Sequence, residues 1–136
     1  MIESRTQFLL IVAPFILMIM VKVSHGSYSD VFAVPDWSMA AVVIYFQSFL
    51  ILLPPIFDVA KKGVGINSFF LLWHLLIMIL VGLLPSFYVY TQIIGLPQGR
   101  LPSVNYQIAQ MGLFIFACVK FFHDHNVVRK LREAVK

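Results

Sequence analysis

The sequence predicts an all-α, polytopic membrane protein with four transmembrane helices, both chain ends in the cytoplasm and a cytoplasmic helical extension after the last span. Its composition is the first reason, because 60% of the 136 residues are hydrophobic and only 12% are charged, which is too apolar for a soluble domain. Four long apolar stretches also alternate with short polar segments. At about 20 residues for each crossing, four spans use most of the chain.

Turn and capping signals separate the apolar stretches and place the predicted helices. Asp36 ends the first polar loop and can cap the second span. Gly63 and Gly65 mark the next turn, after which Asn67 or Ser68 can cap the third span. The predicted spans cover residues 8–23, 37–57, 66–90 and 104–122, the whole bundle covers residues 1–122, and the C-terminal extension covers residues 123–136.

The ten Lys and Arg residues predict how the chain is oriented. Only Lys22 and Arg100 fall on the outer side when both ends are cytoplasmic. An excess of basic residues in short cytoplasmic segments is the usual bias of membrane proteins, and compact loops suit a bacterial inner membrane. The residues predicted to be cytoplasmic are Arg5, Lys61, Lys62, Lys120, Arg129, Lys130, Arg132 and Lys136.

The first two predicted spans contain residues that are unusual in lipid. Pro14 is expected to bend the first span, and Lys22 can extend its ammonium group to the outer surface. Gln47 and Ser48 fall at the centre of the second span. A glutamine amide facing lipid is costly, so we expect Gln47 to face a helix, a neighbouring subunit or water.

The third and fourth predicted spans also carry polar side chains. His74 lies about two turns from the cytoplasmic end of the third span, and no acidic residue is expected at its depth. We interpret it as a neutral histidine that bonds to a neighbouring helix, with a proton sensor as the alternative. Gln107 and Gln110 are three residues apart and therefore share a helix face.

These intramembrane polar residues predict self-association, because they lie on three helices and cannot all face one small core. We expect a homo-oligomer, from a dimer to a tetramer. The polar groups then either hold helices together or line a pore. The residues concerned are Gln47, Ser48, His74, Gln107 and Gln110.

The C-terminal extension is predicted to be a basic amphipathic helix that projects into the cytoplasm. Phe121, Val128, Leu131 and Val135 follow a heptad stripe, which Asp124 interrupts at its fourth position. Such a helix lies on the membrane, bundles with its copies or docks a partner. The candidate docking residues are Val128, Arg129, Lys130, Leu131, Arg132 and Val135.

His123, Asp124 and His125 form a short cluster after the fourth span, and two imidazoles with a carboxylate are ligands for zinc or copper. On a helix, however, residues 123 and 125 point about 200 degrees apart, whereas helical ligand pairs are three or four residues apart. We therefore interpret the cluster as a solvated patch at the membrane surface. No metal or other cofactor is predicted.

Enzyme and ion-coupled transport functions lack support in the sequence. It contains no nucleophile with a base at a recognised spacing, no glycine-rich phosphate loop and no two-histidine zinc helix. No Asp, Glu, Lys or Arg is expected at the middle of a span, as coupled carriers commonly require. The basic excess lies beside helix ends, where lipid accounts for it, so direct binding of nucleic acid is not expected.

A short chain with four spans, cytoplasmic ends, no catalytic motif and a basic cytoplasmic helix resembles the membrane subunits of bacterial two-gene anti-phage systems, particularly the four-span subunit of Kiwa. The resemblance implies an inner-membrane oligomer that senses infection at the envelope and works with a cytoplasmic DNA-binding effector. The outer loops would then be sensing surfaces and residues 123–136 the docking surface. The outer-loop sensing candidates are Tyr28, Phe32, Trp37 and Arg100.

These observations together favour a non-enzymatic membrane sensor or scaffold that recruits a cytoplasmic protein partner. Its other expected partners are membrane lipid and further copies of itself. Two alternatives remain open at this point. One is a small ion channel or pore-forming membrane effector, which Gln47 at the centre of a span would favour. The other is an accessory subunit of a transporter or assembly complex.

Overall fold

The computed structural model describes residues 2–26, 31–63, 65 and 67–136. Every regular element in this part of the chain is helical, as predicted. Tyr28, one of the sensing candidates, lies outside the described residues. The helices are α1 (Ile2–Ser24), α2 (Asp36–Lys62), α3 (Ser68–Ile77), the π-helical segment η2 (Met78–Leu83), α4 (Leu84–Ile94) and α5 (Val104–Val135).

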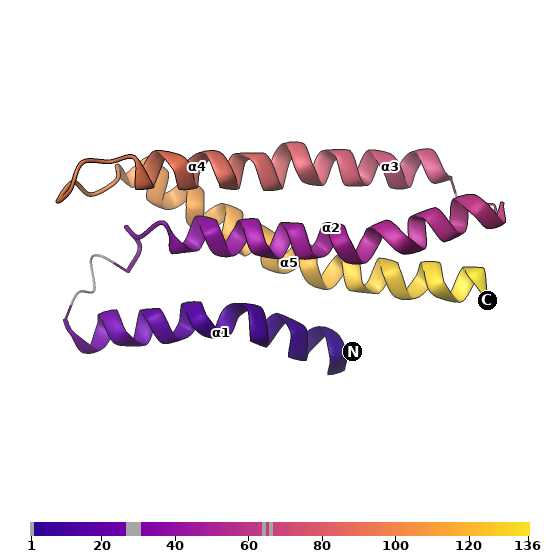
Figure 1. Ribbon diagram of the computed structural model, residues 1–136, viewed down its shortest axis with the longest axis horizontal. Helices are drawn as coiled ribbons and strands as arrows, with labels where there is room; N and C mark the ends of the chain where they lie inside the picture. Colours follow the sequence, from indigo (N-terminus) through magenta and orange to yellow (C-terminus); the bar gives the residue numbers. More distant parts are fainter. Residues whose placement is uncertain (1, 27–30, 64, 66) are drawn as a thin grey trace.

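The helices form four rods that lie lengthwise beside one another, with α3, η2 and α4 joined into a single rod (Figure 1). Successive rods run in opposite directions. The described loop residues 25–26 and 31–35 and the loop at residues 95–103 therefore share one end of the molecule, which we call the loop end. The turn between α2 and α3 lies at the other end with the C-terminus, and we call this the basic end because it holds Lys61, Lys62, Arg129, Lys130, Arg132 and Lys136.

Within the described chain, three segments are long and apolar enough to cross a membrane: Arg5–Ser24, Asp36–Lys62 and Phe69–Ile94. These correspond to the first three predicted spans. The segment α5 falls outside this group, since Gln107, Gln110 and Lys120 interrupt its apolar residues. A crossing by α5 therefore stays a prediction.

Local signals explain where the helices begin and end. The side-chain oxygen of Asn67 accepts hydrogen bonds from the backbone N–H groups of Phe69 and Phe70, at 3.1 and 3.3 Å, so it caps α3 as predicted. Gly63 ends α2 in the left-handed conformation, with φ of 61°, which glycine adopts without a steric cost.

The core lies mainly between α2 and α5, which pack along most of their length. Near the loop end Ser38 of α2 bonds to Gln110 of α5. At the basic end Lys62 donates to the carbonyl of Val135, at 3.0 Å. The buried apolar side chains include Ile44, Tyr45, Leu52, Ile56 and Val59 from α2 and Ala117, Phe121, Val128 and Leu131 from α5.

Residues 123–136, the predicted cytoplasmic extension, take part in the same packing. The C-terminal extension continues α5 without a break and lies against α2. Asp124 does not interrupt the buried stripe; it occupies a position in it, with its side chain fully buried. Val128 and Leu131 face the same core.

The wide turn η2 is explained by Pro85, which follows it. Proline has no backbone N–H, and its ring clashes with the carbonyl four residues earlier in a regular α-helix. In η2 the N–H of Leu84 donates to the carbonyl of Ile79, five residues back, which widens the turn. The Ser86 hydroxyl donates to the carbonyl of Gly82 at 2.7 Å and supplies a further hydrogen bond there.

Gly82 allows α2 to approach η2 closely. The ring of Tyr45 lies where a β-carbon on residue 82 would be, and the Tyr45 hydroxyl donates to the carbonyl of Leu113 at 3.3 Å. We expect Gly82→Ala to lower the free energy of unfolding by about 1–3 kcal/mol, because the rigid ring must move. Thermal unfolding in detergent measures the change.

Gly112→Ala is the matched control. Apart from its chain neighbours and the backbone of α5 itself, no atom of the described residues lies within 4 Å of the β-carbon that this substitution would add in the interior of α5. Alanine favours a helix over glycine by about 1 kcal/mol, so the control should be neutral or stabilising. Equal effects of the two substitutions would contradict the close contact at Gly82.

Candidate functional site

Four polar side chains from two helices meet around a buried carboxylate, toward the basic end of the bundle. We call them the polar cluster: His74 from α3, and Lys120, His123 and Asp124 from α5. Lys120 and Asp124 are four residues apart, so the helix itself places them on one face. His74, which comes 50 residues before Asp124 in the chain, reaches that face of α5 from α3.

The carboxylate of Asp124 is at the centre of the polar cluster. Its Oδ1 lies 2.5 Å from Lys120 Nζ, 3.2 Å from His74 Nε2 and 3.4 Å from His123 Nδ1. Lys120 Nζ is also 2.6 Å from His74 Nε2. One lysine nitrogen therefore lies against both the carboxylate and the imidazole.

Burial makes this arrangement energetically important. The side chain of Asp124 is 0% exposed, that of Lys120 13% and that of His74 22%, whereas that of His123 is 60% exposed. A buried charge is tolerated only when it is paired and hydrogen-bonded. Yet Asp124 Oδ2 is buried and has no hydrogen-bond partner among the described residues, so the carboxylate keeps unused capacity to bind a cation or a donor.

The polar cluster corrects one prediction about the third span. His74 was expected to have no acidic residue at its depth, but Asp124 Oδ1 lies 3.2 Å from its Nε2. Lys120, which was counted among the cytoplasmic charges, pairs with Asp124, and its position relative to a membrane stays a prediction. The available signal was that Asp124 falls on the heptad stripe with Phe121 and Val128, which sequence reasoning treated as an interruption.

His125 points away from the polar cluster, as its spacing from His123 predicted. Its Nδ1 lies 3.0 Å from the carbonyl oxygen of Phe121, and its Nε2 lies 3.2 Å from Gln7 Oε1 in α1. Its ring also packs on Phe121, with centroids 4.3 Å apart. His125 therefore joins α1 to α5 and is not part of the polar cluster.

A second polar contact lies near the loop end. The side chain of Gln110 is fully buried; its Oε1 accepts from Ser38 Oγ at 2.9 Å, and its Nε2 donates to the carbonyl of Phe32 at 2.6 Å. Gln107, which shares its face by spacing, instead donates to the carbonyl of Pro102 at 3.0 Å. The two glutamines thus have separate roles: Gln110 bonds to α2 and the first loop, and Gln107 holds the second loop.

The polar residues at the centre of α2 have fewer hydrogen bonds within the described chain than Gln107 and Gln110. Ser48 Oγ is buried without a hydrogen-bond partner among the described residues. Gln47 is half-buried, and its side chain makes no hydrogen bond within that part of the chain. The structure therefore does not bring Gln47 and Ser48 together with His74, Gln107 or Gln110.

The sensing candidates at the loop end differ in exposure. Trp37 is buried: its Nε1 donates to the carbonyl of Val31 at 2.6 Å, and its ring packs edge-on against Phe114. It is therefore a packing residue and not the surface aromatic that the sequence led us to expect. Phe32 and Arg100 are exposed.

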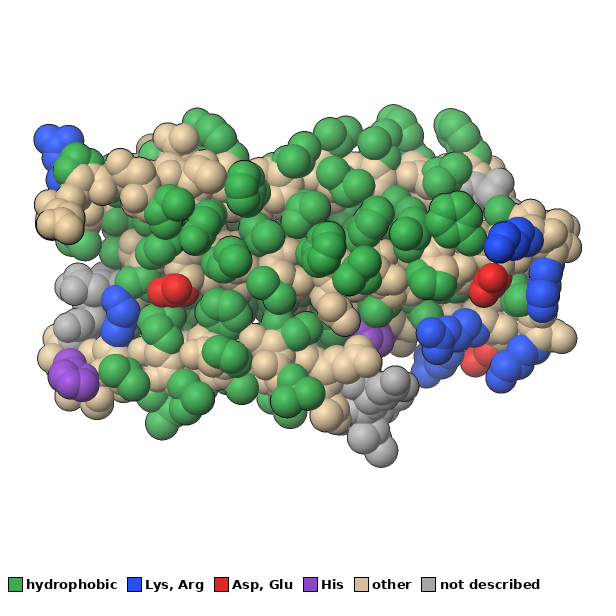
Figure 2. All heavy atoms as spheres, in the orientation of Figure 1, with side chains coloured by type: hydrophobic (Ala, Val, Ile, Leu, Met, Phe, Trp, Pro, Cys, Tyr) green, Lys and Arg blue, Asp and Glu red, His purple; other side chains and the backbone are tan. Residues whose placement is uncertain are grey.

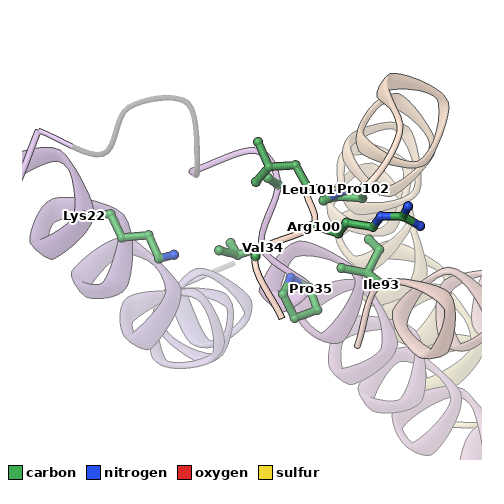
Figure 3. A pocket seen from close by; sticks show the side chains of 9 residues that line it. Lys22, Val34, Pro35, Ile93, Arg100, Leu101 and Pro102 are labelled. Atoms are coloured by element: carbon green, nitrogen blue, oxygen red, sulfur yellow. The ribbon is translucent and has the colours of Figure 1, made fainter. Parts of the chain in front are cut away.

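Arg100 also lines a hollow of 520 Å³ at the loop end. Lys22 reaches toward it from α1, near Val34 and Pro35 (Figure 3). The two outer basic residues predicted from the sequence thus border the same hollow. Its other lining residues are mostly apolar loop residues and Ile93.

The docking candidates of the C-terminal extension are divided by the packing on α2. Val128 and Leu131 are buried, and Val135 is half-buried. Arg129, Lys130 and Arg132 are exposed. Figure 2 shows Lys and Arg side chains gathered at the end where α2 and α5 finish, while apolar side chains cover the middle of that face. Of these docking candidates, the three basic residues are thus the ones that are exposed to a partner.

No protein-family model, no curated protein and no solved structure matches this chain.

Proposed function

We propose that this chain is a non-enzymatic membrane protein that transmits a change at its loop end to a cytoplasmic protein at its basic end. One observation carries the proposal: the continuous helix α5 reaches both places. Its residue Gln110 holds the carbonyl of Phe32 in the first loop, and its exposed Arg129 and Arg132 lie at the other end. At 1.5 Å per residue, the 32 residues of α5 span about 48 Å.

The proposed topology has four spans in a bacterial inner membrane, with α5 as the fourth and the basic end in the cytoplasm. Charge asymmetry supports it even without Lys120, which is paired inside the bundle. Lys22 and Arg100 are the two basic residues at the loop end. The remaining seven are Arg5, Lys61, Lys62, Arg129, Lys130, Arg132 and Lys136, and such a bias favours a cytoplasmic location.

The exposed basic face of α5 determines which kind of partner is expected. Because Val128 and Leu131 are buried against α2, an apolar groove would have little to bind. Arg129, Lys130 and Arg132 complement an acidic protein surface, and such charges guide association and set specificity. We therefore propose a cytoplasmic protein with an acidic docking surface.

Charge reversal tests this proposal. We expect the double variant Arg129→Glu/Arg132→Glu to capture at least about tenfold less partner, because like charges facing each other cost several kcal/mol. The measurement is quantitative mass spectrometry of proteins that co-purify with the chain expressed from its own operon. Cysteine accessibility should show that the orientation in the membrane is unchanged.

Lys22→Glu/Arg100→Glu is the matched control, since it makes the same change of net charge at the loop end. With no stimulus applied at the loop end, it should capture the partner normally, because it leaves the docking residues of α5 unchanged. Full capture by the Arg129→Glu/Arg132→Glu variant would rule out docking on this face. The identity of a captured protein also tests the resemblance to anti-phage membrane subunits, which calls for a DNA-binding effector.

We also propose that copies of the chain associate through the outward face of α2. Gln47 lies near the middle of that helix without a hydrogen bond from the described residues, and an amide in lipid needs a partner. Gln47→Leu should weaken the dimer or larger oligomer by about 1–2 kcal/mol, about a fivefold to thirtyfold change in its dissociation constant.

Energy transfer between labelled copies in liposomes measures this association. Gln92→Leu, an exposed glutamine near the end of α4, serves as the control and should leave association unchanged. An unchanged dissociation constant for Gln47→Leu would exclude Gln47 from the subunit contact. The channel alternative gains support only if such oligomers conduct ions and Gln47→Leu alters that conductance.

A further inference from the structure

We propose that His74, His123 and Asp124 form a binding site for a divalent transition-metal ion, with zinc as the expected metal, and that the Lys120 ammonium competes with this ion for the same two ligand atoms. The site is independent of the proposed signalling role. It uses a histidine from α3 that sequence reasoning did not connect with the cluster at residues 123–125.

The ligand types and their spacing match zinc. Two imidazole nitrogens and one carboxylate oxygen are common zinc ligands, at about 2.0–2.2 Å from the metal, and in a tetrahedral site neighbouring ligand atoms are then about 3.3 Å apart. Asp124 Oδ1 lies 3.2 Å from His74 Nε2 and 3.4 Å from His123 Nδ1. All three ligand atoms lie within 4.8 Å of one another.

The buried carboxylate is an independent indication of a cation site. Asp124 is 0% exposed, and its Oδ2 has no hydrogen-bond partner among the described residues. Buried polar atoms are nearly always satisfied, and an ionised carboxylate out of water needs a compensating charge. A divalent ion bound by Asp124 would supply twice the charge of one ammonium group and could also use Oδ2.

Lys120 already marks the position where a cation is attracted. Its Nζ lies 2.5 Å from Asp124 Oδ1 and 2.6 Å from His74 Nε2. An ammonium group has only donors, so His74 Nε2 must accept and direct its lone pair into the site. The same lone pair is what a metal requires. Because lysine has a long flexible stem, its ammonium group can withdraw when a metal binds.

The site is open on one side, at His123. The side chain of His123 is 60% exposed, and Asp124 lies five residues before Arg129, about 8 Å along the helix. An ion can therefore reach the site from the cytoplasmic surface in the proposed topology. With three protein ligands, a fourth position is open to water or a small ligand.

Metal binding by full-length protein in detergent tests the proposal, with a purification tag that contains no histidine. Co²⁺ gives visible absorption bands that report tetrahedral coordination, and Zn²⁺ titration by calorimetry gives affinity and stoichiometry. We expect one ion per chain for the unmodified protein. His123→Gln should weaken binding by about 10–100-fold. Because the side chain of His123 is 60% exposed, this substitution should leave the fold intact.

His125→Gln is the matched control, because His125 is two residues away but bonds to α1 and the Phe121 carbonyl. It should bind metal as the unmodified protein does. Lys120→Met should bind Zn²⁺ more tightly, and its unfolding temperature should rise on adding Zn²⁺ but not Mg²⁺. Mg²⁺ is a control because it prefers six oxygen ligands.

Three results would overturn the proposal. The first is no Zn²⁺ bound by the unmodified protein at millimolar concentration. The second is an affinity that His123→Gln and His125→Gln reduce equally, which would indicate adventitious surface binding. The third is an unchanged Zn²⁺ affinity in Lys120→Met, which would show that Lys120 does not compete with the metal.

Discussion

Lys120→Met is expected to lower the free energy of unfolding by about 3–5 kcal/mol when a chelator keeps metal away. The substitution leaves the buried carboxylate of Asp124 without its closest counter-charge, and breaking one side of a buried ion pair typically costs this much. Methionine has nearly the same length as the lysine stem, so little packing should be lost. Denaturant or thermal unfolding in detergent gives the free-energy difference.

The double variant Lys120→Met/Asp124→Leu should recover most of that loss. Replacing a whole buried ion pair with apolar residues of similar size is often neutral or stabilising, although His74 then loses both partners. Lys130→Met on the exposed side of the same helix should change stability by less than about 0.5 kcal/mol. If Lys120→Met and Lys130→Met proved equally stable, the ion pair would have no role in holding the fold.

Gln110→Leu has the second largest expected effect, about 2–4 kcal/mol of destabilisation. The substitution removes the acceptor for Ser38 Oγ and the donor for the Phe32 carbonyl. Each buried polar group left unpaired costs about 1–3 kcal/mol. Because the Phe32 carbonyl belongs to the first loop, hydrogen exchange at residues near Phe32 should also become faster, and thermal unfolding gives the overall loss.

A double-mutant cycle isolates this contact. Ser38→Ala removes the unpaired donor, so Ser38→Ala/Gln110→Leu should be more stable than the sum of the single changes predicts. Gln107→Leu is the control on the same helix, since Gln107 is only half-buried and holds a single loop carbonyl. A larger loss for Gln107→Leu than for Gln110→Leu would contradict the assigned roles.

Much of the fold could be predicted because its signals are local. Apolar stretches of sufficient length mark the first three rods, and Gly63 and Asn67 mark the turn between α2 and α3 at the positions where the structure has it. The wide turn η2 was not predictable in the same way. Gly82 and Pro85 were visible in the sequence, but the approach of the Tyr45 ring to Gly82 depends on tertiary packing.

The polar cluster was missed because it is assembled from distant parts of the chain. Lys120 and Asp124 are a local pair, but whether their helix face is buried depends on α2 and α3. His74 comes within reach of Asp124 only when the folded bundle places the side chain of α3 next to α5. Trp37 shows the same limit. An aromatic residue beside a loop is expected at the membrane interface, but the loop at Val31 and the Phe114 ring of α5 together bury it.

The polarity of α5 has a consequence for how the chain enters the bilayer. The predicted fourth span, residues 104–122, carries Gln107 and Gln110 in its outer half and Lys120 near its inner end, and polar or charged side chains oppose the entry of a lone helix into the bilayer. In the proposed topology α5 follows α2 and α3 in the chain, so it emerges from the ribosome after the two helices that hold Ser38 and His74. The order of synthesis thus makes polar partners available before the least lipid-soluble helix has to leave water.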